Sequence, residues 1–239
     1  IGPLAHNILD CAKADAVLSQ QTWKPLDQRS IAGLRVGIPR GLLFTQAEAV
    51  VLHAFEAAVD LLRAENVYIH DVSWDDLLGA PFKLQDKGTL IAAEAAHIHS
   101  NLLASGKAEA LDPLVLSRIR RGEGIAAAHY VGVQQARAQL QQQIDSVMAN
   151  WDILILPTVP VVAPTIASLA DEERFHSTNM LMLRNPSVFN FYDLPAVSLP
   201  LPRPTGQLPV GLMVVGPRNS DRTLLAIACA LENMLMPQA

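Results

Sequence analysis

The sequence contains few cysteines, few charged residues and no long apolar run. Only two of its 239 residues are cysteines, Cys11 and Cys229, which stand near opposite ends of the chain. Two isolated cysteines give neither a disulfide framework nor a metal-ligand spacing, and their apolar neighbours indicate buried free thiols in a reducing compartment. No apolar run approaches the roughly 20 residues that a helix needs to cross a bilayer, and no signal-peptide pattern opens the chain. We therefore expect no membrane segment and a cytoplasmic location.

Charged residues make up only 17% of the chain, and the formal net charge is -5. This balance gives no electrostatic reason to expect a nucleic-acid partner. The densest basic cluster, Arg118, Arg120 and Arg121, has no interleaved aromatic residues and is interpreted as a solvated helix end. Half of the residues are hydrophobic, which is typical of a globular chain with a core of ordinary depth.

Motifs that bind nucleotides or activate a nucleophile are also missing. There is no P-loop, no Gly-x-Gly-x-x-Gly and no Gly-x-Ser-x-Gly, so we predict no cofactor and no catalytic residue within this chain. Ser105, in Ser105-Gly106-Lys107, comes nearest to a nucleophile but lies in a polar turn without a base.

A metal site is not predicted either. Glu94 and His97 share a helix face, but His97 and His99, two residues apart, point away from each other. No second Glu-x-x-His pair exists to complete a two-metal site.

Buried strands are the clearest positive signal. Ile153 to Leu156 is fully apolar and ends at Pro157, as is typical of a central strand covered on both faces. Ala196 to Leu199 and Gly211 to Val215 repeat this pattern. Earlier in the chain, Leu34 to Pro39 and Val67 to Val72 flank an amphipathic helix at Gln46 to Ala64, which predicts a βαβ unit with parallel strands.

Helices are expected at residues 3–19, 126–149 and 224–236. The fold class is therefore α/β: a mixed, mostly parallel central sheet covered by helices on both faces. With no repeat and no linker, we expect residues 1–239 to form a single α/β domain portion, with a helix-rich block at about 75–150.

Several polar residues are candidates for lining a pocket. In open α/β sheets, ligands bind beyond the carboxyl ends of the strands, where Thr158 stands. Asn185, Ser187 and Asn190 are expected on a loop that leads into the strand at 196–199. Tyr130 and Arg137, seven residues apart on the long helix, share a face. Arg137 could bind a carboxylate, or it could pair with a backbone carbonyl or with Asp145.

Taken together, these segments make the sequence resemble the amidase signature family. Five of them match the family's motifs in order and cover essentially the whole chain: Gly2-Pro3-Leu4-Ala5 with Asp10, Leu34 to Pro39, Asp152 to Pro160, Asn190 to Pro200, and Pro209 to Gly216 with Asp221 and Leu224-Leu225. Such enzymes hydrolyse linear amides with a Ser nucleophile, a bridging Ser in a cis peptide and a Lys base.

The resemblance implies that this triad precedes the Gly-Pro segment. Because the chain starts at Ile1 without a Met, we expect the carboxyl-terminal part of an amidase, inactive alone. We also expect it to pair with its missing amino-terminal half or to self-associate, since a divided sheet leaves an open edge.

The resemblance also suggests substrate-binding residues. Tyr130 and Arg137 align with the helix from which the glutamyl-tRNA(Gln) amidotransferase A subunit presents a carboxylate-binding Arg, and Asn190 carries over as a residue near the pocket. Three positions depart from the family: His6 replaces an Arg, Asp193 replaces a Gly, and Ser220 stands where the amidotransferase has an Asp. The alternatives are therefore an amidotransferase A-type subunit, which needs a partner chain, and a non-catalytic amidase-like binding or scaffold protein.

Overall fold

The computed structural model describes residues 2–236, which divide into two compact units. One unit, called here the sheet unit, comprises residues 2–75 together with 144–236. The other, the helical unit, comprises residues 76–143. The two units are described separately.

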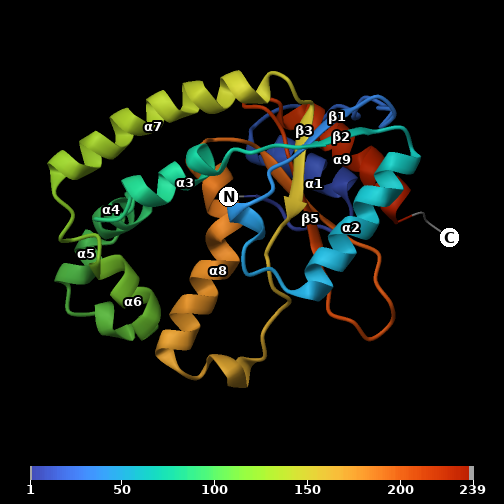
Figure 1. The fold of residues 1–239 in the computed structure, drawn as a ribbon. Coiled ribbons are helices and arrows are strands. Elements are labelled where there is room, and N and C mark those ends of the chain that lie inside the picture. Colours follow the sequence, from blue (N-terminus) through green and yellow to red (C-terminus); the bar gives the residue numbers. More distant parts are fainter. Residues whose placement is uncertain (1, 237–239) are drawn as a thin grey trace. The chain divides into compact units, whose positions relative to one another are not determined.

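The sheet unit contains a five-stranded sheet in the order β2-β1-β3-β5-β4 (Figure 1). The strands are β1 (Arg35–Ile38), β2 (Tyr68–Asp71), β3 (Ile153–Pro157), β4 (Ala196–Pro200) and β5 (Gly211–Val215). β1 is parallel to both β2 and β3, whereas β5 is antiparallel to both β3 and β4. Four strands therefore run in one direction and β5 in the other, which confirms the expected mixed, mostly parallel sheet.

The predicted βαβ unit is confirmed. α2 (Ala49–Ala64) connects β1 to β2, whose register pairs Val36 with Ile69. The buried residues of α2 recur at helical spacing, from Val51 and Phe55 to Leu62, so that one stripe of the helix faces the sheet.

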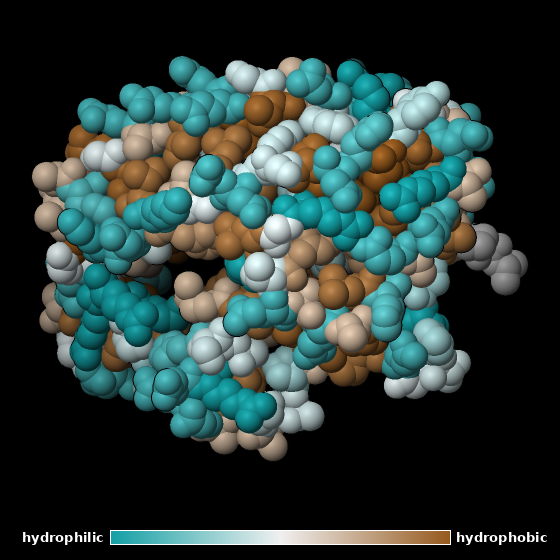
Figure 2. All heavy atoms as spheres, in the orientation of Figure 1, coloured by the Kyte–Doolittle hydropathy of each residue, from teal (hydrophilic) through white to brown (hydrophobic). Residues whose placement is uncertain are grey.

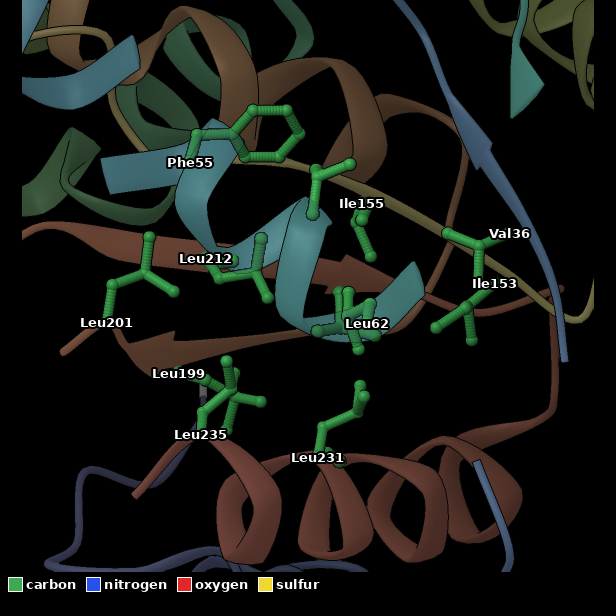
Figure 3. Packing of buried hydrophobic residues seen from close by; sticks show 14 of the residues in the cluster. Val36, Phe55, Leu62, Ile153, Ile155, Leu199, Leu201, Leu212, Leu231 and Leu235 are labelled. Atoms are coloured by element: carbon green, nitrogen blue, oxygen red, sulfur yellow. The ribbon is translucent and has the colours of Figure 1, made fainter. Parts of the chain in front are cut away.

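A single hydrophobic cluster joins this stripe to α1 (Ile8–Leu18), α9 (Asp221–Leu235) and one face of the sheet. Figure 3 shows Leu62 of α2, and Leu231 and Leu235 of α9, pointing toward this cluster. Burying each such side chain fully stabilises the fold by about 1.5–3 kcal/mol.

β3 is covered on both faces, as its apolar sequence predicted. Successive side chains of a strand point to opposite faces, so Ile153 and Ile155 lie on one side and Leu154 and Leu156 on the other. All four side chains are buried, yet only Ile153 and Ile155 belong to the large cluster. A second set of apolar contacts therefore covers the other face.

The segment before β4 differs from the expectation. Asn185, Ser187 and Asn190, expected on a loop, lie in α8 (Glu172–Phe191), which continues through Pro186. A proline inside a helix removes one backbone hydrogen bond. Here burial of Val188 and Phe189, three and four residues after Asn185, offsets that loss.

The helical unit contains no strand among residues 76–143. Its helices are α3 (Asp75–Leu84, whose first residue belongs to the sheet unit), α4 (Leu90–Ile98), α5 (Ser100–Ala104), α6 (Pro113–Arg120) and most of α7 (Ala127–Met148). Asp112 caps α6 by accepting the Leu114 and Val115 N–H groups, with Pro113 at the first helical position. After α6, Gly122 lies so close to α4 that a Cβ atom would stand 1.9 Å from the Ala92 carbonyl oxygen. Only glycine fits there.

Three short 3-10 helices complete the secondary structure of the described residues: η1 (Leu42–Phe44), η2 (Ala108–Ala110) and η3 (Ile166–Leu169). Among residues 2–236, no helix is both long enough and apolar enough to cross a membrane. Hydrophobic residues also reach the surface among hydrophilic ones on the face in Figure 2. Over the whole described surface, exposed hydrophobic residues include Val17, Leu18 and Tyr68.

Candidate functional site

The candidate site begins where β1 and β3 end. These neighbouring strands are parallel, so their carboxyl ends lie at one edge of the sheet, the usual ligand position in open α/β sheets. η1 lies just beyond β1, and Thr158 follows β3 directly.

Arg40 fixes the chain just after β1. Its guanidinium pairs with Glu56 of α2 at 2.5 Å and with Asp71 of β2 at 3.1 Å. It also lies over the rings of Phe44 and Phe55, with 5.3 Å and 5.6 Å to the ring centroids. The hydrogen bond to Glu56 raises the pKa of Arg40, so this cation stays charged.

Asn185 of α8 is completely buried at this edge. Its Nδ2 group donates to the Leu43 carbonyl at 3.1 Å and to the Pro157 carbonyl at 2.9 Å. One amide group therefore connects the segment after β1, the end of β3 and α8.

Arg184 extends the same connection. Its Nε donates to Asn185 Oδ1 at 3.1 Å, Nη2 donates to the Leu43 carbonyl, and Nη1 donates to the carbonyl and hydroxyl oxygens of Thr45, the last three at 2.8 Å. Burial lowers the pKa of Arg184. These acceptors are all neutral oxygens, so Arg184 acts as a multiple donor to the loop.

Thr158 contributes a hydroxyl at the rim of this edge. Its Oγ1 shares a hydrogen bond of 2.6 Å with Ser198 Oγ on β4, and its backbone N–H donates to the Gly211 carbonyl. A Cβ atom at Gly211 would stand 2.6 Å from Ser198 Oγ and 2.8 Å from Thr158 Oγ1. The glycine therefore leaves space for this hydroxyl pair.

Asn190 and Asp193 mark the carboxyl end of α8. Asn190 is exposed, and its side chain makes no hydrogen bond within residues 2–236. Asp193 has φ +55°, and the Asp193 and Leu194 N–H groups donate back to the Asn190 and Phe189 carbonyls. This is the Schellman arrangement, in which a left-handed residue follows the helix. Asp193 therefore makes the left-handed turn that a glycine usually makes at this position.

Tyr130 and Arg137 lie on α7 in the helical unit, two turns apart as predicted. The Tyr130 hydroxyl donates to Glu94 Oε1 at 3.1 Å and accepts from Gln134 Nε2 at 3.0 Å. Arg137 is half-buried. Asp145, one of the partners considered for Arg137, forms a two-point pair with Arg218, at 2.7 Å and 3.3 Å.

The other candidates from the sequence have local partners only. Ser105 Oγ donates to the Leu102 carbonyl within its own turn. Across residues 2–236, no group of three or more His, Cys, Asp or Glu side chains could hold a metal ion. Ser220 Oγ donates to the Pro217 carbonyl at 2.6 Å, just before α9.

Arg184 was not predicted from the sequence. The sequence does contain a signal for the buried helix face next to Arg184. Asn185, Val188 and Phe189 stand at i, i+3 and i+4, so they share one face of a helix, and all three are buried. Pro186 concealed that pattern, since a proline normally ends a helix.

The chain is similar to known proteins over nearly its full length. A family model described as Amidase matches residues 1–225. The 2-amino-5-chloromuconic acid deaminase of Comamonas testosteroni is 29% identical over 98% of this chain and 51% of that protein. The A subunit of the glutamyl-tRNA(Gln) amidotransferase of Halobacterium salinarum is 29% identical over 84% of this chain and 51% of that protein.

The fold shows the same relationship. A crystal structure described as an amidase superposes with a TM-score of 0.80 at 26% identity, over 98% of this chain and 52% of that chain. The chain thus spans about half the length of the curated relatives it matches.

Proposed function

Because this chain belongs to the amidase family, we propose that it is the carboxyl-terminal part of an enzyme that hydrolyses a linear amide to an acid and ammonia or an amine. One observation carries this proposal: the family match covers residues 1–225, while the chain spans about half of each relative. The activity, the substrate and the partners of the whole protein are part of the proposal.

The nucleophilic serine, the bridging serine and the lysine base are assigned to a segment upstream of Gly2. In support, the hydroxyls of Ser105, Ser168, Ser187 and Ser220 donate to backbone carbonyls three residues earlier, not to a base. Acyl transfer needs a nucleophile and a base in contact, so this chain alone is expected to be inactive.

The described part of the chain supplies the wall of the substrate site. Asn190 is assigned a contact with the substrate because its amide is exposed and has both a donor and an acceptor to offer. Tyr130 is assigned a polar contact, and Arg137 the binding of a substrate carboxylate. No cofactor takes part, and the location is the cytoplasm.

The test is amide hydrolysis, measured as ammonia release from a panel of small linear amides. The 239-residue chain should release none above buffer, and the protein that carries it with an upstream amidase half should turn over at least one amide. Turnover by the isolated chain would contradict the assignment of the triad to the upstream half.

We also propose a protein partner, either the amino-terminal half of the amidase or a second copy of this chain. β4 is an edge strand of the described sheet, paired on one side with β5, and three of its five residues are exposed: Ala196, Ser198 and Pro200. Exposed edges of this kind favour strand addition. Light scattering of the isolated chain should show self-association. A stable monomer would contradict the proposal that the exposed edge at β4 needs a partner.

A second candidate is the A-type subunit of an amidotransferase, supported by the similarity to the Halobacterium salinarum amidotransferase chain. It predicts co-purification with a partner chain and glutamine-dependent ammonia transfer. Ser220, where the amidotransferase has an Asp, favours the amidase.

A further inference from the structure

Apart from Tyr192, Asn185 is the one residue with a polar side chain that is fully buried among residues 2–236. Its amide group donates to two carbonyls from different elements, that of Leu43 in η1 and that of Pro157 at the end of β3. Its oxygen accepts from Arg184. Buried polar side chains are nearly always hydrogen-bonded, because a buried group without a partner destabilises the fold. An apolar residue would pack on the same helix face, so packing alone does not explain the asparagine.

Arg184 holds the loop after β1 at three further points, all on Leu43 and Thr45. A planar guanidinium has five N–H donors in a rigid fork, so it fixes the positions of several acceptors at once. A lysine would offer one ammonium group in place of this fork.

The two segments held in this way, called here the two loops, are η1 with Thr45 after β1, and the end of β3 with Thr158 directly after it. They lie at the edge where open α/β sheets bind ligands. The partners are 142 and 28 residues away from Asn185 in the sequence, so no local structure would bring them together. Pro157 directly precedes Thr158, whose hydroxyl stands at the rim beside Ser198.

We propose that Arg184 and Asn185 are positioning residues that hold the loops after β1 and β3 in register and so shape the wall of the substrate site. They act through these loops and touch no reacting atom. The expected effect on activity rests on the proposed function, whereas the expected effect on the loops does not.

The first experiment measures amide hydrogen exchange in the 239-residue chain. Asn185→Leu and Arg184→Lys are compared with Asn179→Leu and Arg174→Lys, the same substitutions on the same helix. Asn179 makes no side-chain hydrogen bond within residues 2–236, and Arg174 is exposed.

The reporters are the Phe44, Thr45 and Thr158 amides, each of which has a backbone hydrogen bond. Exchange at these amides should accelerate by about tenfold or more in Asn185→Leu and by less in Arg184→Lys. Local opening of the two loops no longer has to break the hydrogen bonds that the replaced side chain made to them. Exchange at the Val214 amide in β5 should be the same in these variants as in the control variants Asn179→Leu and Arg174→Lys. Equal acceleration at Val214 would mean global destabilisation and would overturn the proposal, as would unchanged exchange in the loops.

The second experiment measures amide hydrolysis by the full-length protein. Asn185→Leu should raise KM by about tenfold and change kcat by less than about threefold, since a displaced wall weakens binding more than chemistry. An unchanged KM in a folded variant would overturn the positioning role. If the unmodified protein hydrolyses no amide, the proposed function fails, and the exchange measurement still decides whether the pair positions the loops.

Discussion

The two units are built by different means. The sheet unit pairs strands that are far apart in the sequence, such as β1 with β3, and packs α1, α2 and α9 against them in one cluster. The helical unit combines the short helices α3 to α6 with most of the long α7 and has few buried side chains, among them Ala96, Leu116 and Ile119. Non-local burial therefore stabilises the sheet unit, whereas close backbone approach and local helix caps contribute more in the helical unit.

The largest expected effect is in the core of the sheet unit. Ile155→Ala should lower the free energy of unfolding by about 3 kcal/mol, because Ile155 is fully buried in β3 and its neighbours cannot fill the cavity. Ile119→Ala in α6 should cost about 2 kcal/mol or less, since its unit offers fewer buried neighbours. Urea denaturation followed by circular dichroism measures both. Equal losses of stability in the two variants would contradict the proposed difference between the two units.

The next effect tests the close approach in the helical unit. Gly122→Ala should destabilise by about 2 kcal/mol, because the new methyl group would stand against the Ala92 carbonyl. Gly132→Ala in α7 is the matched control, since nothing lies within 4 Å of its added Cβ atom. It should be neutral or slightly stabilising, because alanine favours helix. Thermal unfolding of the two variants should diverge; similar curves would contradict the role of Gly122.

A smaller effect of the opposite sign is expected at the end of α8. Asp193→Gly should stabilise the chain by about 1 kcal/mol, because a residue with a Cβ atom is strained at φ +55° and glycine is not. Unfolding in urea measures the change. A loss of stability would show that the contacts of the Asp193 side chain outweigh the backbone strain.

The smallest effect is the acid dependence of the pairing at the start of β1 and β3. Hydrogen bonds from Arg35 lower the pKa of Asp152 below its usual value. A carboxylate whose pKa is lower in the folded state stabilises the fold above its unfolded pKa, and this contribution is lost as the pH falls through the folded pKa.

The pair is largely exposed, so its contribution at neutral pH is small. Asp152→Asn should therefore lower stability at neutral pH, and should lower it less at acid pH, as the pH falls through the folded pKa of Asp152. Urea denaturation at both pH values measures this, and an equal loss at both would contradict the assignment to the charge.

Much of the fold could be predicted from residue patterns. The apolar runs at 153–156, 196–199 and 211–215 predicted three strands, and the structure has strands at these residues. The long helix that carries Tyr130 and Arg137 was also predicted correctly. α8 was not, because Pro186 indicates a helix end while tertiary burial of Val188 and Phe189 keeps the helix intact.

The α/β fold class, the parallel βαβ unit and the family could be predicted from the amino-acid sequence, because local hydrophobic periods and short motifs specify all three. The partners of Arg184 and Asn185 depend on the three-dimensional fold. Their hydrogen bonds span up to 142 residues, and no local pattern specifies which distant carbonyl a buried amide will meet.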